Sequence, residues 1–151
     1  MINENDFHFM RIAIEEAEIA YEKGEVPVGA VLVQDNVVIA RAHNCRESFN
    51  DPTGHAETLV LRLGAHKKAT WRLNHATLYV TKEPCVMCAG AMINARLGHL
   101  IYGCRDEKGG AVDSLYRILS DERLNHTVEI VSGVLQEECA GLLKKFFQER
   151  R

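Results

Sequence analysis

The chain has 151 residues, of which 46% are hydrophobic and 26% are charged, a composition typical of a soluble globular domain. No apolar run approaches the roughly 18 residues that span a bilayer, and the stretch from Met1 to Asp6 is polar and acidic rather than a signal peptide, so we expect no membrane association and a cytoplasmic location. The formal net charge of −3 argues against nonspecific coating of nucleic acid but is compatible with a local basic patch, and the 5 cysteines, an odd number, predict reduced thiols.

The first element predicted in chain order is an amphipathic helix. Apolar residues recur at spacings of three and four positions across residues 7–21, the pattern of one helix face. Asn5 or Asp6 is the expected N-cap, and Gly24 is the expected end of the helix.

A hairpin is predicted next. Residues 26–33 are β-branched and apolar, residues 34–36 form a turn, and residues 37–40 return as a second strand, which indicates an antiparallel pair. The segment 41–54 is polar and rich in turn residues, so we expect it to be a loop.

The middle of the chain predicts a helix and then a strand–helix–strand unit. The first helix carries His55 and ends near Gly64, and a strand follows at residues 76–81. The second helix is expected to begin at Pro84, because proline suits the first helical position, and to run to about Arg96. With a strand at residues 99–102, this unit predicts parallel strands joined by a right-handed crossover.

The last third predicts a loop, a short helix, a strand and a final helix. The charged loop covers residues 103–110, the short helix residues 114–120 and the strand residues 128–131, and an apolar stripe begins at Leu135. The whole chain, 1–151, is therefore expected to form a single domain. Its predicted fold class is α/β, a three-layer α/β/α arrangement around a mixed five-stranded sheet.

Two short motifs carry the candidate chemistry. Cys85 and Cys88 are three residues apart, so on a helix they share a face, and in a first turn the helix dipole favours their thiolates. His55 and Glu57 follow a turn-rich segment and also lie near a predicted helix start. On a regular helix they would be about 200° apart, but in a first turn both side chains can lean over the open end. We therefore expect two helix N-termini to point at one site.

One imidazole and two thiolates supply three ligands whose charge neutralises one Zn²⁺. Closed structural zinc sites use four protein ligands, whereas catalytic sites leave a position for water, and Glu57 is placed to move protons of that water. The alternatives are a structural zinc site, which needs a fourth ligand such as Cys104 or His99, and a metal-free redox pair.

The two motifs together resemble the zinc-dependent cytidine/deoxycytidylate deaminase superfamily. The wider sequence is similar to the bacterial tRNA-specific adenosine deaminase family over nearly the whole chain. The segments that carry this resemblance are residues 25–31, 51–53, 78–81, 83–92 and 125–126. One departure is Gly54, where the family usually has alanine, and it touches no ligand.

The resemblance implies a cytidine deaminase-like fold, a homodimer and a set of substrate-binding residues. These residues are Val28, Asn44, Ala56, Pro84, Asp106 and Lys108, and the basic and aromatic composition of the tail adds Phe147 and Arg150 to the expected substrate-binding residues. From the residues alone, Asn44 suits either a ribose or base edge or an ordinary turn, and Asp106 and Lys108 suit either a substrate-contacting or a solvated loop.

The C-terminal tail, residues 144–151, sets aromatic residues among cations. Phe147 lies off the apolar stripe and is free to stack on a base, whereas Phe146 is expected to face inward. The alternative interpretation of the tail is an amphipathic helix end packed on the sheet, and both interpretations can hold together.

The resemblance implies zinc-dependent hydrolytic deamination of adenosine to inosine at the wobble position of a tRNA anticodon, with an arginine tRNA as the expected substrate. The implied metal ligands are His55, Cys85 and Cys88, with one Zn²⁺ per chain, and Glu57 is the implied catalytic residue. The alternatives are a deaminase of free nucleobases or nucleosides, such as guanine or cytosine, and a non-catalytic zinc module that binds RNA or a protein.

Overall fold

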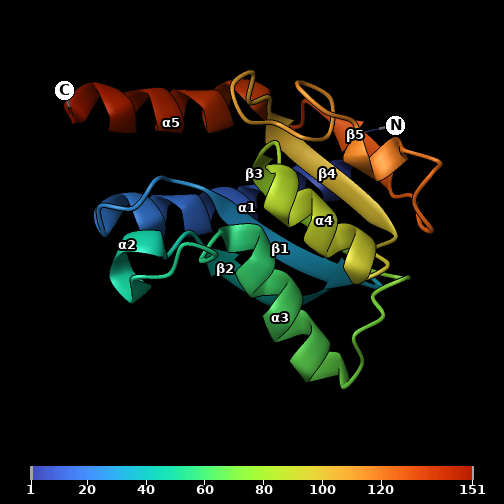
Figure 1. Cartoon of the computed structure of the whole chain (residues 1–151). Coiled ribbons are helices and arrows are strands. Elements are labelled where there is room, and N and C mark those ends of the chain that lie inside the picture. Colours follow the sequence, from blue (N-terminus) through green and yellow to red (C-terminus); the bar gives the residue numbers. More distant parts are fainter. Residues whose placement is uncertain (1, 151) are drawn as a thin grey trace.

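The computed structural model describes residues 2–150, so Met1 and Arg151, which belong to the predicted acidic start and basic tail, lie outside the described residues. Its elements in chain order (Figure 1) are α1 (Glu4–Glu22), β1 (Gly29–Gln34), β2 (Val37–His43), α2 (Arg46–Phe49), α3 (Ala56–Lys68), β3 (Thr77–Lys82), α4 (Val86–Asn94), β4 (His99–Cys104), the 3₁₀ helix η1 (Ile118–Ser120), β5 (Glu129–Ser132) and α5 (Gln136–Glu149). Within residues 2–150, none of the helices combines the length and the apolar character that crossing a bilayer requires.

The strands form one mixed five-stranded sheet in the order β2-β1-β3-β4-β5. β1 pairs antiparallel with β2 and β3, whereas β4 pairs parallel with β3 and β5. The predicted hairpin and the predicted parallel unit through α4 are therefore both confirmed. Helices lie on both sides of this sheet (Figure 1), which confirms the predicted α/β class.

Alternating side chains along the strands separate two cores. Leu32 of β1 and Leu78 of β3 lie in a core with residues of α3 and α4, whereas Val31 and Tyr79, their chain neighbours, lie in a second core with residues of α1 and α5. This alternation is the period-two pattern of a strand with both faces buried. The sheet is therefore packed on both faces, and α3 and α4, which carry the candidate residues at their N-termini, pack against one of them.

The first helix begins earlier than predicted. Asn3, not Asn5 or Asp6, is the N-cap of α1, and it forms a capping box with Asp6: each residue's backbone N–H donates to the other's side chain, at 3.1 and 3.0 Å. The sequence prediction was wrong because Asp6 is the third residue of the helix rather than its cap. β1 also begins three residues later than expected, since Pro27 has no N–H to donate to a sheet.

The helix that carries Glu57 continues through Gly64 to Lys68, so its predicted end was wrong. Gly64 serves packing instead, because a Cβ there would lie 2.2 Å from Cδ2 of Leu32 on β1. The absent side chain lets α3 lie close against the sheet.

Three shorter segments also differ from prediction. The expected loop 41–54 contains the end of β2 and the single turn α2, while only residues 118–120 of the expected helix 114–120 are helical. α4 ends at Asn94 rather than Arg96, and Arg96 itself has a left-handed φ of 57°. Local sequence patterns mark such element boundaries poorly because tertiary contacts decide them.

Candidate active site

The site lies where two helix N-termini meet beside the sheet. His55 is the N-cap of α3 and Cys85 is the N-cap of α4, and neither side chain makes a capping hydrogen bond to its helix. Glu57 and Cys88 lie in the first turns that follow. The predicted convergence is therefore present, although Pro84 precedes the cap of α4 instead of opening the helix.

The distances between the three candidate ligands fit a tetrahedral zinc ion. Nδ1 of His55 lies 3.6 Å from Sγ of Cys85 and 3.4 Å from Sγ of Cys88, and all three ligand atoms lie within 4.8 Å of one another. Zinc bonds of about 2.05 Å to nitrogen and about 2.3 Å to sulfur, at a tetrahedral angle, separate nitrogen from sulfur by about 3.6 Å. These residues form a metal-binding triad of the kind found in zinc deaminases.

No fourth protein ligand joins the triad within residues 2–150. Cys104 is buried and donates to the carbonyl of Thr81, and His99 pairs with Glu129 at 3.0 Å. A metal held here would therefore have a coordination position open toward the cavity, as catalytic zinc sites do.

The three side chains of the triad shift one another's pKa values. The pKa of the Cys85 thiol is lowered, chiefly because Cys88 donates to its thiolate, and the pKa of Cys88 is raised in turn. The pKa of His55 is raised because it donates to the same thiolate. Two sulfurs thus compete for one proton, and a divalent metal resolves this competition because ligand cysteines bind it as thiolates.

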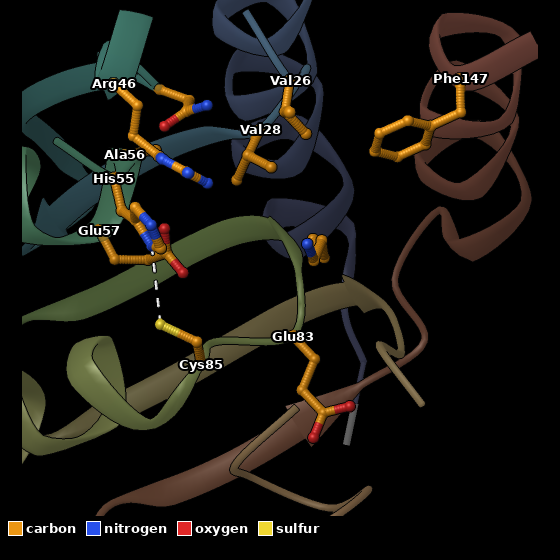
Figure 2. A pocket seen from close by; sticks show the side chains of 11 residues that line it. Val26, Val28, Arg46, His55, Ala56, Glu57, Glu83, Cys85 and Phe147 are labelled. Atoms are coloured by element: carbon orange, nitrogen blue, oxygen red, sulfur yellow. Dashed lines mark hydrogen bonds between the residues drawn. The ribbon is translucent and has the colours of Figure 1, made fainter. Parts of the chain in front are cut away.

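Glu57 is the buried carboxylate of the site, with 4% of its surface exposed. Its pKa is raised, mainly by that burial. Figure 2 shows its side chain beside His55 and on the same side of the cavity as Cys85. Glu57 is outside the metal triad and lines the cavity, so it is free to exchange protons with a molecule bound there.

A cavity of about 280 Å³ opens over the triad (Figure 2). Four of the expected substrate-binding residues line it: Val28, Asn44, Ala56 and Phe147. Asn44 is 5% exposed, and its side-chain oxygen has no hydrogen-bond partner within the described chain. A buried acceptor without a partner is costly, so this amide is suited to a ligand that donates a hydrogen bond.

Phe146 and Phe147 divide as the sequence predicted. Phe146 is 4% exposed and packs inward, whereas Phe147 is 49% exposed and extends from α5 toward the cavity (Figure 2). The packed helix end is therefore confirmed at Phe146, whereas stacking of a base on Phe147 stays a prediction.

Four other expected substrate-binding residues do not line this cavity. The carbonyl of Pro84 accepts from Ala111, and Asp106 pairs with Lys82 at 3.3 Å while also capping the backbone of Lys108. The guanidinium of Arg150 lies 3.9 Å over the ring of Phe146. Arg150 lines a neighbouring hollow, which it shares with Asn44 and Arg46.

The cavity also contains four residues that the sequence analysis did not select: Val26, Arg46, Lys82 and Glu83. Val26 had a signal, because it belongs to the same short segment as Val28. Glu83 directly precedes Pro84-Cys85, which was also a usable signal. No sequence feature marked Arg46 or Lys82 as site residues, because isolated cations are common on protein surfaces.

Glu83 organises the loop that follows β4. Its carboxylate accepts hydrogen bonds from the backbone N–H groups of Asp106, Val112, Asp113 and Ser114 and from the hydroxyl of Ser114. Burial opposes its ionisation, but these hydrogen bonds outweigh burial and lower the pKa of Glu83 to about 2. Figure 2 shows this side chain directed away from His55 and Cys85.

The fold and the His-Cys-Cys triad together define a deaminase of the cytidine deaminase-like superfamily. Consistent with this class, the model of the MafB19-like deaminase family matches residues 4–151.

Individual relatives narrow the family further. The tRNA-specific adenosine deaminase of Bacillus subtilis (strain 168) is 52% identical over 143 residues, which cover 95% of this chain and 89% of that protein. A structure solved in a study of A-to-I editing by tRNA:A34 deaminases superposes with a TM-score of 0.87 at 47% identity, covering 89% of this chain and 98% of the other. A guanine deaminase from Bacillus subtilis is more distant, with a TM-score of 0.63 and 33% identity over 69% of this chain and 66% of the other. The chain belongs to the family of the tRNA-specific adenosine deaminases.

Proposed function

We propose that this protein catalyses the zinc-dependent hydrolysis of adenosine to inosine, with release of ammonia, at the wobble position of a tRNA anticodon, and that its substrate is an arginine tRNA. The observation that carries the proposal is the buried Glu57 beside a three-ligand metal triad, at the base of a cavity with an unpartnered amide oxygen. The names of the close relatives support the choice of tRNA as substrate.

His55, Cys85 and Cys88 would hold one Zn²⁺ per chain. When bound, zinc lowers the pKa of a water molecule and so supplies a nucleophile near neutral pH. Glu57 would take a proton from a water molecule and deliver it to N1 of the adenine ring as the water oxygen adds to C6. It would then take the remaining proton of that oxygen and pass it to the amino group, which leaves as ammonia when the bond between C6 and that nitrogen breaks. Val28 and Ala56 form walls of the cavity, and the Asn44 side-chain oxygen accepts a hydrogen bond from the bound nucleoside.

An RNA substrate fits the surroundings of the cavity better than a free base does. The target base must leave its stack to enter, and the exposed ring of Phe147 offers a surface on which a neighbouring base can stack. The cations Arg46 and Lys82 line the same cavity, and cations near a substrate site favour a phosphate backbone.

Deamination of free nucleobases is the second candidate, because a guanine deaminase shares the fold. The two candidate activities are distinguished by incubating the zinc-loaded protein separately with an anticodon stem-loop, guanine, cytosine or free adenosine. Inosine is read by sequencing and ammonia by a coupled assay. The proposal requires turnover of the stem-loop far above turnover of the free bases, and the reverse order would refute it. A non-catalytic zinc module would release no ammonia from any of them.

We also propose that the protein forms a homodimer through α3 and α4. These helices lie on one face of the sheet (Figure 1) and expose Leu63 and Val86, which are 52% and 51% accessible. A Cβ on Gly90 of α4 would meet nothing within 4 Å in the described chain, although glycine inside a helix costs about 1 kcal/mol relative to alanine. A closely packed partner explains this glycine, so Gly90→Arg should turn a dimer into a monomer in sedimentation velocity. A wild-type monomer would refute the proposal.

A further inference from the structure

The single turn α2 is held by a residue from outside its own sequence. α2 has 4 residues, and its N-cap, Cys45, makes no side-chain hydrogen bond to it. A helix this short does not persist in water on its own, because nucleation costs more than one turn of hydrogen bonds returns. Its unsatisfied N–H groups therefore need acceptors from elsewhere.

Glu25 supplies those acceptors. Its carboxylate accepts from the backbone N–H of Glu47 at 3.1 Å, and from both the N–H and the hydroxyl of Ser48 at 2.6 Å. Only 1% of Glu25 is exposed, and its own N–H donates to the carbonyl of Ala20 at the end of α1. The end of α1 therefore fixes the position of Glu25, and the Glu25 carboxylate in turn fixes the position of α2.

α2 in turn carries part of the cavity wall. Arg46, its first residue, lines the cavity above the metal triad, and Asn44 lies two residues before it. In Figure 2 the Arg46 side chain extends toward Val28 and His55. Arg46 forms no ion pair within residues 2–150, in contrast to Lys82, which pairs with Asp106. Its guanidinium remains available for an anion at the mouth of the cavity.

We propose that Glu25 is a positioning residue, which holds α2 so that Arg46 meets a phosphate group next to the target adenosine. This inference rests on the proposed function, since an RNA backbone provides the phosphate. The planar guanidinium suits phosphate because it can donate two parallel hydrogen bonds. Holding α2 in place before the substrate arrives lowers the ordering cost of binding.

The test compares Glu25→Gln, Arg46→Gln and the double variant, all zinc-loaded, on an anticodon stem-loop. Glutamine keeps the size of Glu25 but replaces one acceptor oxygen with a donor that would face the N–H groups of α2. Each single variant should raise KM by about tenfold, the typical worth of a hydrogen bond to a charged group, with a much smaller change in kcat. The double variant should raise KM no further than either single one, because Glu25 acts through Arg46.

Hydrogen exchange provides a second readout that does not depend on turnover. Amides of residues 46–50 should exchange faster in Glu25→Gln, while zinc content stays at the wild-type level. If Glu25→Gln fails to fold, Ser48→Ala removes one of the donors and should produce smaller changes in the same direction. The proposal is overturned if KM and the exchange of residues 46–50 stay at wild-type values, or if the effects of Glu25→Gln and Arg46→Gln on KM add independently.

Asp6→Asn is the matched control. Asp6 is another buried carboxylate, 4% exposed and hydrogen-bonded to Asn3 and Tyr79. It lies near the opposite end of α1, about 24 Å along the helix axis from Glu22 at 1.5 Å per residue. It should lower stability without changing KM, and an equal rise in KM in this control would attribute the effect to general destabilisation and refute the proposal. If the wild-type protein forms no inosine, the proposed function fails, and hydrogen exchange still decides whether Glu25 holds α2.

Discussion

Gly110→Ala should destabilise the protein strongly, because Gly110 lies directly against the Glu83 carboxylate. A Cβ at Gly110 would lie 2.3 Å from Cδ of Glu83 and 2.5 Å from each of its oxygens. No flexible side chain can yield there, since the carboxylate is fixed by hydrogen bonds from Asp106, Val112, Asp113 and Ser114. The loop or Glu83 must move, which breaks part of that set.

The cost combines overpacking, typically about 1–3 kcal/mol, with the loss of at least one hydrogen bond to a charged group, about 1.5–3 kcal/mol. We therefore expect a loss of roughly 3–5 kcal/mol in the free energy of unfolding, measured by urea titration. Gly141→Ala on α5 is the matched control. Its Cβ would meet nothing within 4 Å, so it should gain up to about 1 kcal/mol from helix propensity. Equal stability of the two alanine variants would refute the role assigned to Glu83.

Glu57→Gln should lower kcat by at least about 10²-fold while metal analysis still finds one zinc per chain, and a kcat near the wild-type value would exclude Glu57 as the proton carrier. Cys88→Ala should lose the metal and lower the unfolding midpoint, because the free energy of metal binding is also free energy of folding, and a variant that retains zinc would contradict the ligand assignment. Phe147→Ala should raise KM for the stem-loop by about tenfold through lost stacking, and an unchanged KM would show that this ring contacts no base. Although burial opposes ionisation of Glu16, hydrogen bonds from His43 and Arg41 lower its pKa below the ordinary 4.5. The stability that Glu16 contributes is therefore fully present above pH 4.5 and is lost as the pH falls through the lowered pKa. The difference in unfolding free energy between the wild type and Glu16→Gln should shrink over that range, and a constant difference would contradict this assignment.

The arrangement of the candidate site was largely predictable from local sequence. His55, Glu57, Cys85 and Cys88 occur as two short motifs, and the spacing within each motif already places the residues at helix starts. A run of β-branched and apolar residues likewise predicted the first strand of the hairpin. These features depend on interactions within a few residues along the chain, which a sequence displays directly.

The supporting residues were not predictable in the same way. Glu25 and Glu83 act on backbone groups more than 20 residues away, and no local pattern marks a carboxylate for that role. The expected substrate residues Asp106 and Arg150 turn instead to Lys82 and to the ring of Phe146. Such pairings arise only when the fold brings distant segments together, so they lie beyond local patterns.

The most direct test of the central claim uses the zinc-loaded wild-type protein and an arginine tRNA anticodon stem-loop with adenosine at the wobble position. Sequencing should show conversion to inosine at that adenosine alone, with one ammonia released per inosine formed. A protein that carries one zinc per chain yet converts no adenosine in this stem-loop would contradict the account.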